Sequence, residues 1–202
     1  SWVDKALSII PKCRDLQTRL QGSLYLFLYF IWNGDIPNAR AVIESTRQLI
    51  PASPLYPQIK ILFHLLEARF FCLVAQFDDS IRSVDKGLEI ARASGMHSWD
   101  FLLLNEGVSG SLGKGDLRSA SEYLRRMSPV LGTDHAGLKA YYYHLSSWLA
   151  SLAGDKPLAI SQNEKALEVT TQCGAPCAIA LDNLHLAILK SEVGNEIGRA
   201  HV

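Results

Sequence analysis

The stretch of this sequence that comes nearest to a catalytic motif is GVSGSLGKGD, residues 107–116. A Walker phosphate loop has four residues between its first Gly and the Gly-Lys pair, and a Ser or Thr after the Lys for the metal. Here five residues separate Gly107 from Gly113, and Gly115 follows Lys114. We therefore predict that this stretch is the end of a helical hairpin and that it binds no nucleotide.

A cysteine pair, Cys173 and Cys177 in CGAPC, is the only arrangement that suggests a metal or redox site. Three interpretations fit this pair: half of a metal site, a disulfide across a turn, or two free thiols. A structural zinc needs four ligands, whereas the sequence has no second cysteine pair and His185 is the only nearby imidazole. We predict no metal. The four cysteines are sparse, which favours reduced thiols in the cytoplasm.

Two further polar pairs have helical spacing: HLLE, residues 64–67, and DNLH, residues 182–185. Neither is the two-histidine helix motif of a zinc protease, so we expect polar contacts at a hairpin interface. No nucleophile elbow, dinucleotide-binding fingerprint or other multi-residue catalytic pattern is found. The sequence predicts no enzyme, no catalytic residue and no cofactor.

The composition excludes other classes of function. The chain has 202 residues, 48% of them hydrophobic, and its 20 basic and 20 acidic side chains are interspersed. Such a charge balance argues against direct contact with nucleic acid or a membrane surface. The most apolar run, LYLFLYFIW at residues 24–32, is too short for a membrane span of roughly 20 residues. No signal peptide is visible, and both ends lead us to expect a fragment of a longer multidomain protein.

A six-residue marker recurs along the chain as GDIPNA, AQFDDS, GDLRSA, GDKPLA and, weakly, GNEIGR. Its copies start at residues 34, 75, 115, 154 and 194, at steps of 41, 40, 39 and 40. In each copy a small residue ends one helix, and an Asp or Asn caps the next. Residues seven before and five after each start are mostly small, as a tight helix crossing requires. The period predicts an all-α solenoid of about five antiparallel helix pairs, without a sheet, in a single domain over residues 1–202.

The G-D-x-x-x-A marker between two helices resembles the tetratricopeptide class, which implies a right-handed superhelix. The lengthened unit resembles the sensor arm of MalT-like regulators, which are bacterial signal-transduction ATPases with a LuxR-type DNA-binding domain. The sequence departs from the standard pattern in its period of about 40 rather than 34 residues, its missing aromatic-Leu-Gly positions, and a loosely placed Pro51 and Pro129. We therefore transfer no ligand-binding residues from that class.

Repeat arrays bind partners on a concave surface that is lined by the first helix of each unit. Residues thirteen, ten, six and three before each marker are expected to face it. Among them we select six candidate binding residues: Arg69, Asn105, Ser109, Tyr141, His144 and Trp148. Large amphipathic side chains of this kind suit recognition. The stretch YYYHLSSW, residues 141–148, also fits a core stripe, and both interpretations stay open.

The sequence thus predicts a non-catalytic binding module. The resemblance implies the sensor arm of a MalT-like, LuxR-family transcriptional regulator, located in the cytoplasm, that takes a protein, a peptide or a small-molecule effector in its groove. The alternative is a stand-alone interaction scaffold or a peptide-sensing repeat protein. The apolar faces at the ends of such an array also permit self-association.

Overall fold

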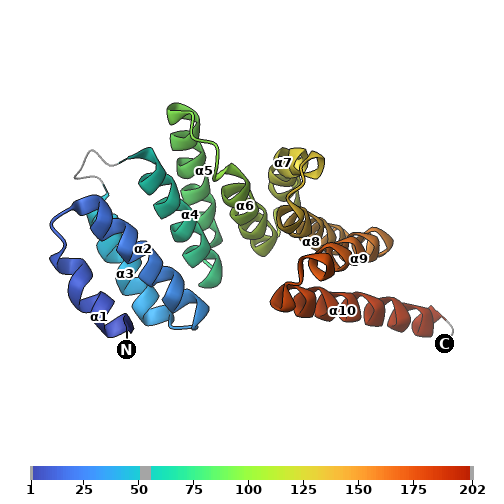
Figure 1. Cartoon of the computed structure of the whole chain (residues 1–202). Coiled ribbons are helices and arrows are strands. Elements are labelled where there is room, and N and C mark those ends of the chain that lie inside the picture. Colours follow the sequence, from blue (N-terminus) through green and yellow to red (C-terminus); the bar gives the residue numbers. More distant parts are fainter. Residues whose placement is uncertain (1, 51–55, 201–202) are drawn as a thin grey trace. The chain divides into compact units, whose positions relative to one another are not determined.

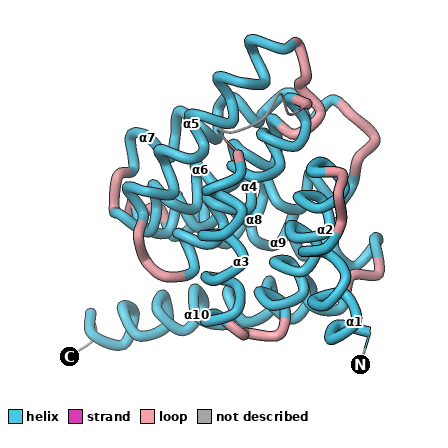
Figure 2. Tube along the Cα trace, turned by 90° about the vertical axis from the view of Figure 1, so that its left-hand side faces the viewer, coloured by secondary structure: helices cyan, strands magenta, loops and turns pink. Residues whose placement is uncertain are grey.

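The computed structural model describes residues 2–50 and 56–200, except for the side chains of residues 195–200. Over this part the chain forms ten α-helices and two short 3-10 helices and contains no strand, which confirms the all-α prediction (Figures 1 and 2). In chain order these elements are α1 (Trp2–Ile9), η1 (Ile10–Lys12), α2 (Leu16–Trp32), α3 (Ile36–Leu49), α4 (Pro57–Leu73), α5 (Phe77–Ser94), α6 (Asp100–Lys114), α7 (Leu117–Met127), η2 (Ser128–Gly132), α8 (Ala136–Leu152), α9 (Lys156–Cys173) and α10 (Pro176–Ala200).

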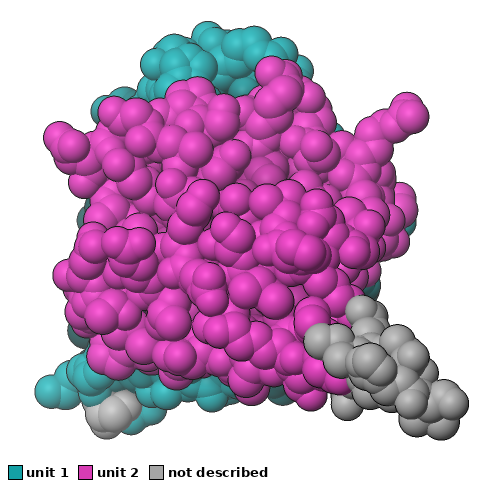
Figure 3. Space-filling view, turned by 90° about the vertical axis from the view of Figure 1, so that its right-hand side faces the viewer, with its two compact units in different colours: residues 1–106 teal, residues 107–202 magenta. Residues whose placement is uncertain are grey.

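The chain divides into two compact units, residues 1–106 and 107–202, which Figure 3 shows in two colours. The division falls inside α6. The first unit contains α1 to α5 and the beginning of α6, and the second contains the rest of α6 and the helices up to α10.

Four of the five predicted turns join antiparallel helices. Gly34, Gly115 and Gly154 adopt φ values of 71°, 80° and 82°, and Ala75 adopts 57°, so all four residues are in the left-handed region. The Asp after each of the three glycines accepts a hydrogen bond from a backbone N–H in the first turn of the next helix, as Asp155 does from Leu158 at 3.1 Å. The markers therefore define the hairpins α2–α3, α4–α5, α6–α7 and α8–α9.

The fifth predicted turn is wrong. Helix α10 continues through Gly194 to Ala200, so no hairpin turn forms there. A single Gly inside a helix costs about 1 kcal/mol relative to Ala, which a long helix tolerates. The described part of the chain therefore has four complete hairpins, with α1 before them and α10 after them, rather than five pairs.

Small residues set the crossing within each hairpin, as predicted. The residue five after each turn residue has no exposed surface in any of the four hairpins, a set that consists of Ala39, Ser80, Ala120 and Ala159. Ser80 donates a hydrogen bond of 2.9 Å to the carbonyl oxygen of Ala68, and Ser147 donates one of 2.7 Å to that of Ala159. The hydroxyl thus reaches the backbone of the facing helix, which requires a close approach of the two helices.

Each unit has its own core. In the first unit α2, α3 and α4 enclose Phe27, Ile43, Phe63 and Phe70, and the rings of Phe27 and Phe70 lie 6.2 Å apart. Fully burying such a side chain stabilises the fold by roughly 1.5–3 kcal/mol. In the second unit Ala150, Ala159 and Leu189 form a small buried cluster between α8, α9 and α10. Among the described residues, no helix combines the length and apolar character that a membrane crossing needs.

Candidate binding groove

Two of the six predicted binding residues meet at a buried carboxylate. Arg69 on α4 donates to Oε1 of Glu106 on α6, at 2.8 Å from Nε and 2.5 Å from Nη2, and Asn105 donates to the same oxygen at 3.1 Å. Glu106 is 2% exposed and Asn105 5%. Burial raises the pKa of Glu106, although Arg69 and Asn105 act in the opposite direction. These contacts connect α4 to α6 and use Nε and Nη2 of Arg69 and the side-chain nitrogen of Asn105.

A third predicted residue, His144 on α8, belongs to a polar network with α9 and α10. Its Nδ1 donates to Oδ1 of the buried Asp182 at 2.9 Å, and Thr170 donates to Oδ2 of Asp182 at 3.0 Å. Asn163 donates to the backbone oxygen of Asp182 at 2.7 Å and pairs with Nδ1 of His185 at 3.1 Å. The network fixes α10 on the α8–α9 hairpin.

The two histidines of this network lie close together, with ring centroids 5.7 Å apart. Burial lowers the pKa of His185, and a charge on His144 lowers it further, while Asp182 and Glu192 act in the opposite direction. The DNLH pair is therefore a helix-packing contact, as the sequence predicts. The HLLE pair also lies at a helix interface: within α4, Nδ1 of His64 lies 3.2 Å from Oε2 of Glu67, and Glu67 accepts hydrogen bonds of 2.8 Å from Ser83 on α5 and Arg47 on α3.

The other three predicted residues occupy different environments. Tyr141 is 52% exposed on α8, Trp148 is half-buried two turns further along the same helix, and Ser109 is half-buried on α6. The predicted assignment of these six residues to a concave ligand surface stays a prediction. All four cysteines are free thiols, and among the described residues no group of His, Cys, Asp and Glu could hold a metal ion.

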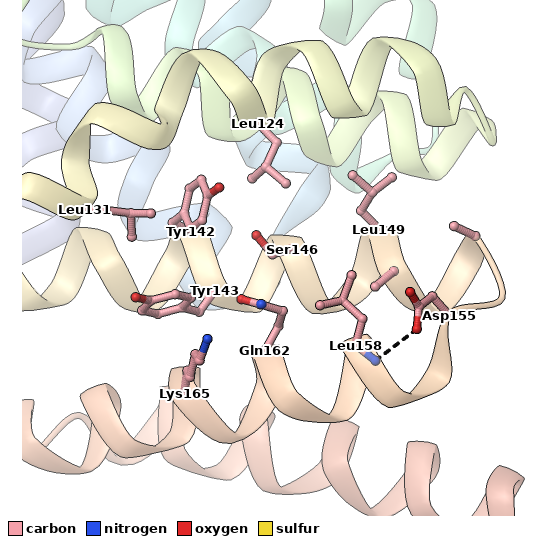
Figure 4. A pocket seen from close by; sticks show the side chains of 12 residues that line it. Leu124, Leu131, Tyr142, Tyr143, Ser146, Leu149, Asp155, Leu158, Gln162 and Lys165 are labelled. Carbon is pink, nitrogen blue, oxygen red and sulfur yellow. Dashed lines mark hydrogen bonds between the residues drawn. The ribbon is translucent and has the colours of Figure 1, made fainter.

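The second unit contains an open groove of about 540 Å³ between α7, α8 and α9 (Figure 4). We call it the α7–α9 groove. Its apolar lining includes Leu124 and Leu131 on one side, Leu149 and Ala150 from α8, and Leu158 from α9. None of the six predicted residues lines it. The groove residues from α8 and its C-cap are Tyr142, Tyr143, Ser146, Leu149, Ala150 and Ala153, which belong to a different face from the predicted one.

The two ends of the α7–α9 groove differ in charge. At one end Nζ of Lys165 lies 5.8 Å from the ring centroid of Tyr143, and the Tyr142 ring meets the Tyr143 ring edge-on at 5.8 Å. At the other end stands Asp155, the N-cap of α9, whose bond to Leu158 is drawn in Figure 4. Ser146 and Gln162 lie near each other in the middle. The groove thus combines an apolar lining with one cationic, aromatic end.

Comparing the four hairpins explains why the groove opens here. We call the residue eight before the turn residue the floor position, and the residue eight after it the wall position. In the second hairpin these are Glu67 and Ser83, joined by a hydrogen bond of 2.8 Å. In the third they are Gly107 and Tyr123, and a Cβ added to Gly107 would lie only 2.9 Å from Cδ1 of Tyr123. Both positions are therefore filled in these two hairpins.

The first and fourth hairpins have grooves at the same register. In the first unit a smaller groove of about 240 Å³ is lined by the floor residue Leu26, the wall residue Val42 and, four before the turn, Phe30. In the fourth hairpin the equivalent residues are Ser146, Gln162 and Ala150. The floor residue and the residue four before the turn are smaller in the fourth hairpin than in the first, so the groove in the second unit is the larger of the two.

Sequence reasoning missed this groove because the expected binding face was transferred from repeat proteins in general. The available signal was the residue type at equivalent positions of the repeat: Leu26, Glu67, Gly107 and Ser146 share one phase and differ greatly in volume. Aligning the copies at both the floor and the wall positions would have distinguished the fourth hairpin, because its small floor residue Ser146 faces Gln162, whereas the still smaller Gly107 faces the bulky Tyr123.

The fold places the chain in a broad class, the all-α helical-repeat-like proteins. The chain is similar to the crystal structure of BtubC (BKLC) from P. vanneervenii, with a TM-score of 0.71, 14% sequence identity, and coverage of 95% of this chain and 80% of that one. At this identity the likeness concerns the fold alone. No family model matches the sequence, and no curated protein does.

Proposed function

We propose that the chain is a non-catalytic binding module that takes a segment of a partner protein into the α7–α9 groove. The observation that carries this proposal is the groove itself, which pairs an apolar lining with the Tyr142, Tyr143 and Lys165 end. Apolar grooves between helices are an established docking site for segments of other proteins. Helical-repeat proteins commonly act by binding other proteins.

Selection of binders for the intact chain tests the proposal. A displayed library of random 16-residue peptides is selected on the folded chain, and thermal shifts are measured in parallel with sugars and nucleotides. A ligand that binds only the folded state raises the melting temperature. Peptide binding that is lost on Ser146→Leu and retained on Tyr141→Ala supports the groove. Loss on Tyr141→Ala or Trp148→Ala alone would move the site to the face predicted from sequence, and a response only to small molecules would argue for an effector sensor.

At the level of architecture, we propose that the hairpins stack in chain order into a right-handed, tetratricopeptide-like superhelix. The constant period, the repeated turn and the shared small-residue crossing support it. Buried carboxylates that bond to the preceding repeat, such as Glu106 to Arg69, also support it.

We propose further that the module is the sensor or interaction arm of a cytoplasmic MalT-like, LuxR-family regulator, and the support is the sequence resemblance together with the helical-repeat fold. The alternative is a stand-alone scaffold, which is favoured by the fact that a fold of this kind makes up most of the matched BtubC chain. The full reading frame distinguishes the two. A nucleotide-binding domain upstream and a helix-turn-helix downstream would support the regulator, and their absence would refute it.

A further inference from the structure

We propose that the occupant of the α7–α9 groove is a short amphipathic helix of a partner protein, which places an acidic side chain beside Lys165. This inference rests on the proposed function, because it assumes that the groove is a binding site. It adds the conformation and the charge of the ligand.

The dimensions of the groove suit a helix. The part of α8 and its C-cap that lines the groove runs from Tyr142 to Ala153, which at 1.5 Å per residue is about 17 Å, or three helical turns. Ser146, Ala150 and Ala153 are spaced four and three residues apart, so these small side chains face the groove on successive turns. Small residues allow another helix axis to approach within roughly 8–10 Å.

The polarity of the groove also favours a helix over an extended peptide. An extended chain leaves its backbone N–H and C=O groups in need of partners, whereas a helix bonds its own. The middle of the groove offers only the side chains of Ser146 and Gln162 for that purpose, and Leu124, Leu149 and Leu158 line the rest. Docking an amphipathic helix by apolar side chains three and four residues apart is an established mode of recognition.

The positive charge of Lys165 at one end of the groove favours an acidic residue in the ligand. Lys165 is exposed, and its amino group is directed toward the Tyr143 ring (Figure 4). Within the described part of the chain, no carboxylate is paired with it. Asp155 at the opposite end already accepts a hydrogen bond from Leu158, and its negative charge disfavours an acidic ligand residue there. The ligand is therefore expected to carry its acidic residue at the Lys165 end only.

The fourth hairpin is suited to this role, and the equivalent place in the second hairpin provides a control. Lys86 on α5 stands eleven residues after Ala75, as Lys165 stands eleven after Gly154. The floor position there is Glu67, which Arg47 and Ser83 contact at 2.8 Å each. Lys86 is therefore a lysine at the position equivalent to Lys165, in a hairpin whose floor position is filled by the buried side chain of Glu67.

Peptides selected from the random 16-residue library on the full chain test the inference. The expected sequences have apolar residues spaced by three and four and an acidic residue at one end, and they become helical by circular dichroism on binding. Lys165→Glu should weaken their binding about tenfold, Lys86→Glu should leave it unchanged, and a peptide whose acidic residue is replaced by Lys should regain affinity for Lys165→Glu.

The outcomes separate this inference from the proposed function. If the selected peptides lose binding on Ser146→Leu but lack helical spacing, or if Lys165→Glu has no effect on them, the inference is overturned and the groove remains a binding site. If Ser146→Leu leaves peptide binding intact, both fail. Should Ser146→Leu not fold, Lys165→Glu still decides the inference, because it changes only an exposed side chain.

Discussion

Ser83 on α5 donates a hydrogen bond of 2.8 Å to Oε2 of Glu67 on α4, and these residues are the wall and floor of the second hairpin. Arg47 donates to the other carboxylate oxygen at 2.8 Å. A position that is open in the fourth hairpin is therefore closed here by a buried, fully bonded carboxylate. The energetics of such carboxylates can be tested directly.

Glu67→Gln should destabilise the chain at neutral pH. Burial alone raises the pKa of Glu67, but hydrogen bonds from His64, Ser83 and Arg47 outweigh it and lower the pKa from 4.5 to about 2. Because the folded-state pKa is the lower one, the ionised group stabilises the fold above pH 4.5, and this contribution is lost as the pH falls toward 2. A shift of this size corresponds to roughly 3 kcal/mol. Urea unfolding at about pH 7 and pH 3 measures it, and an equal loss at both values would contradict the assignment.

Glu106→Gln should behave in the opposite way with pH. Burial raises the pKa of Glu106, so the unfolded chain ionises first and the stability due to this group declines as the pH rises above its unfolded value. The variant lacks this decline. The free energy of unfolding of the variant, relative to that of wild type, should therefore be more favourable at about pH 7 than at pH 4. At pH 7 this variant should lose less stability than Glu67→Gln does. A larger loss at pH 7 than at pH 4 would show that the bond to Arg69 outweighs burial.

Gly107→Ala should cost about 1–2 kcal/mol of stability. The added Cβ would lie 2.9 Å from Cδ1 of Tyr123, and crowding of a packed interface costs more than the helix propensity that Ala adds. Gly137→Ala on α8 is the control, since nothing lies within 4 Å of its Cβ position. Thermal unfolding of both variants decides the matter, because a stabilised Gly107→Ala would mean that α6 and α7 do not approach this closely.

Ala75→Gly should stabilise the chain by about 1 kcal/mol. Ala75 is the one described residue other than Gly with a positive φ, 57°, and this conformation costs an L-residue roughly 1–2 kcal/mol. Gly154→Ala, at a φ of 82°, should lose a similar amount. The midpoints of chemical denaturation check both changes, and a loss of stability in Ala75→Gly would contradict the left-handed turn.

His185→Gln should flatten the pH dependence of stability on the acidic side of neutrality. Burial and the neighbouring His144 lower the pKa of His185 below 6.5, so the unfolded chain takes up the proton first and stability falls as the pH drops below that value. Gln retains a donor for Asn163 and removes the titration. Unfolding measured between about pH 7.5 and 5 should show a smaller slope in the variant than in wild type, and an unchanged slope would contradict the burial of His185.

The sequence was sufficient to predict what depends on local geometry. A residue that tolerates positive φ, followed by a helix cap and a small residue, specifies the hairpin at Gly154 without reference to the rest of the chain. The same reasoning was wrong at Gly194, because a Gly ends a helix only where the following residues favour a new one. Helix α10 instead continues through this position.

The binding groove depended on information that periodicity does not contain. Spacing assigns Ser146 and Gln162 to facing positions of one hairpin, but whether those positions are filled depends on the volume of both side chains and of Ala150. Tyr141, His144 and Trp148 were selected by residue type on another face of α8. His144 proved to be bonded to Asp182, a partner 38 positions away that spacing alone did not suggest.

The floor and wall positions take no part in the turn, the helix cap or the small-residue crossing. Evolution can therefore open a groove in one hairpin, or fill the equivalent place in another, by substitutions at these two positions that leave the backbone of the repeat unchanged. Opening such a groove removes buried side-chain volume and therefore costs stability, whereas a bulky floor residue such as the buried Leu26 retains it.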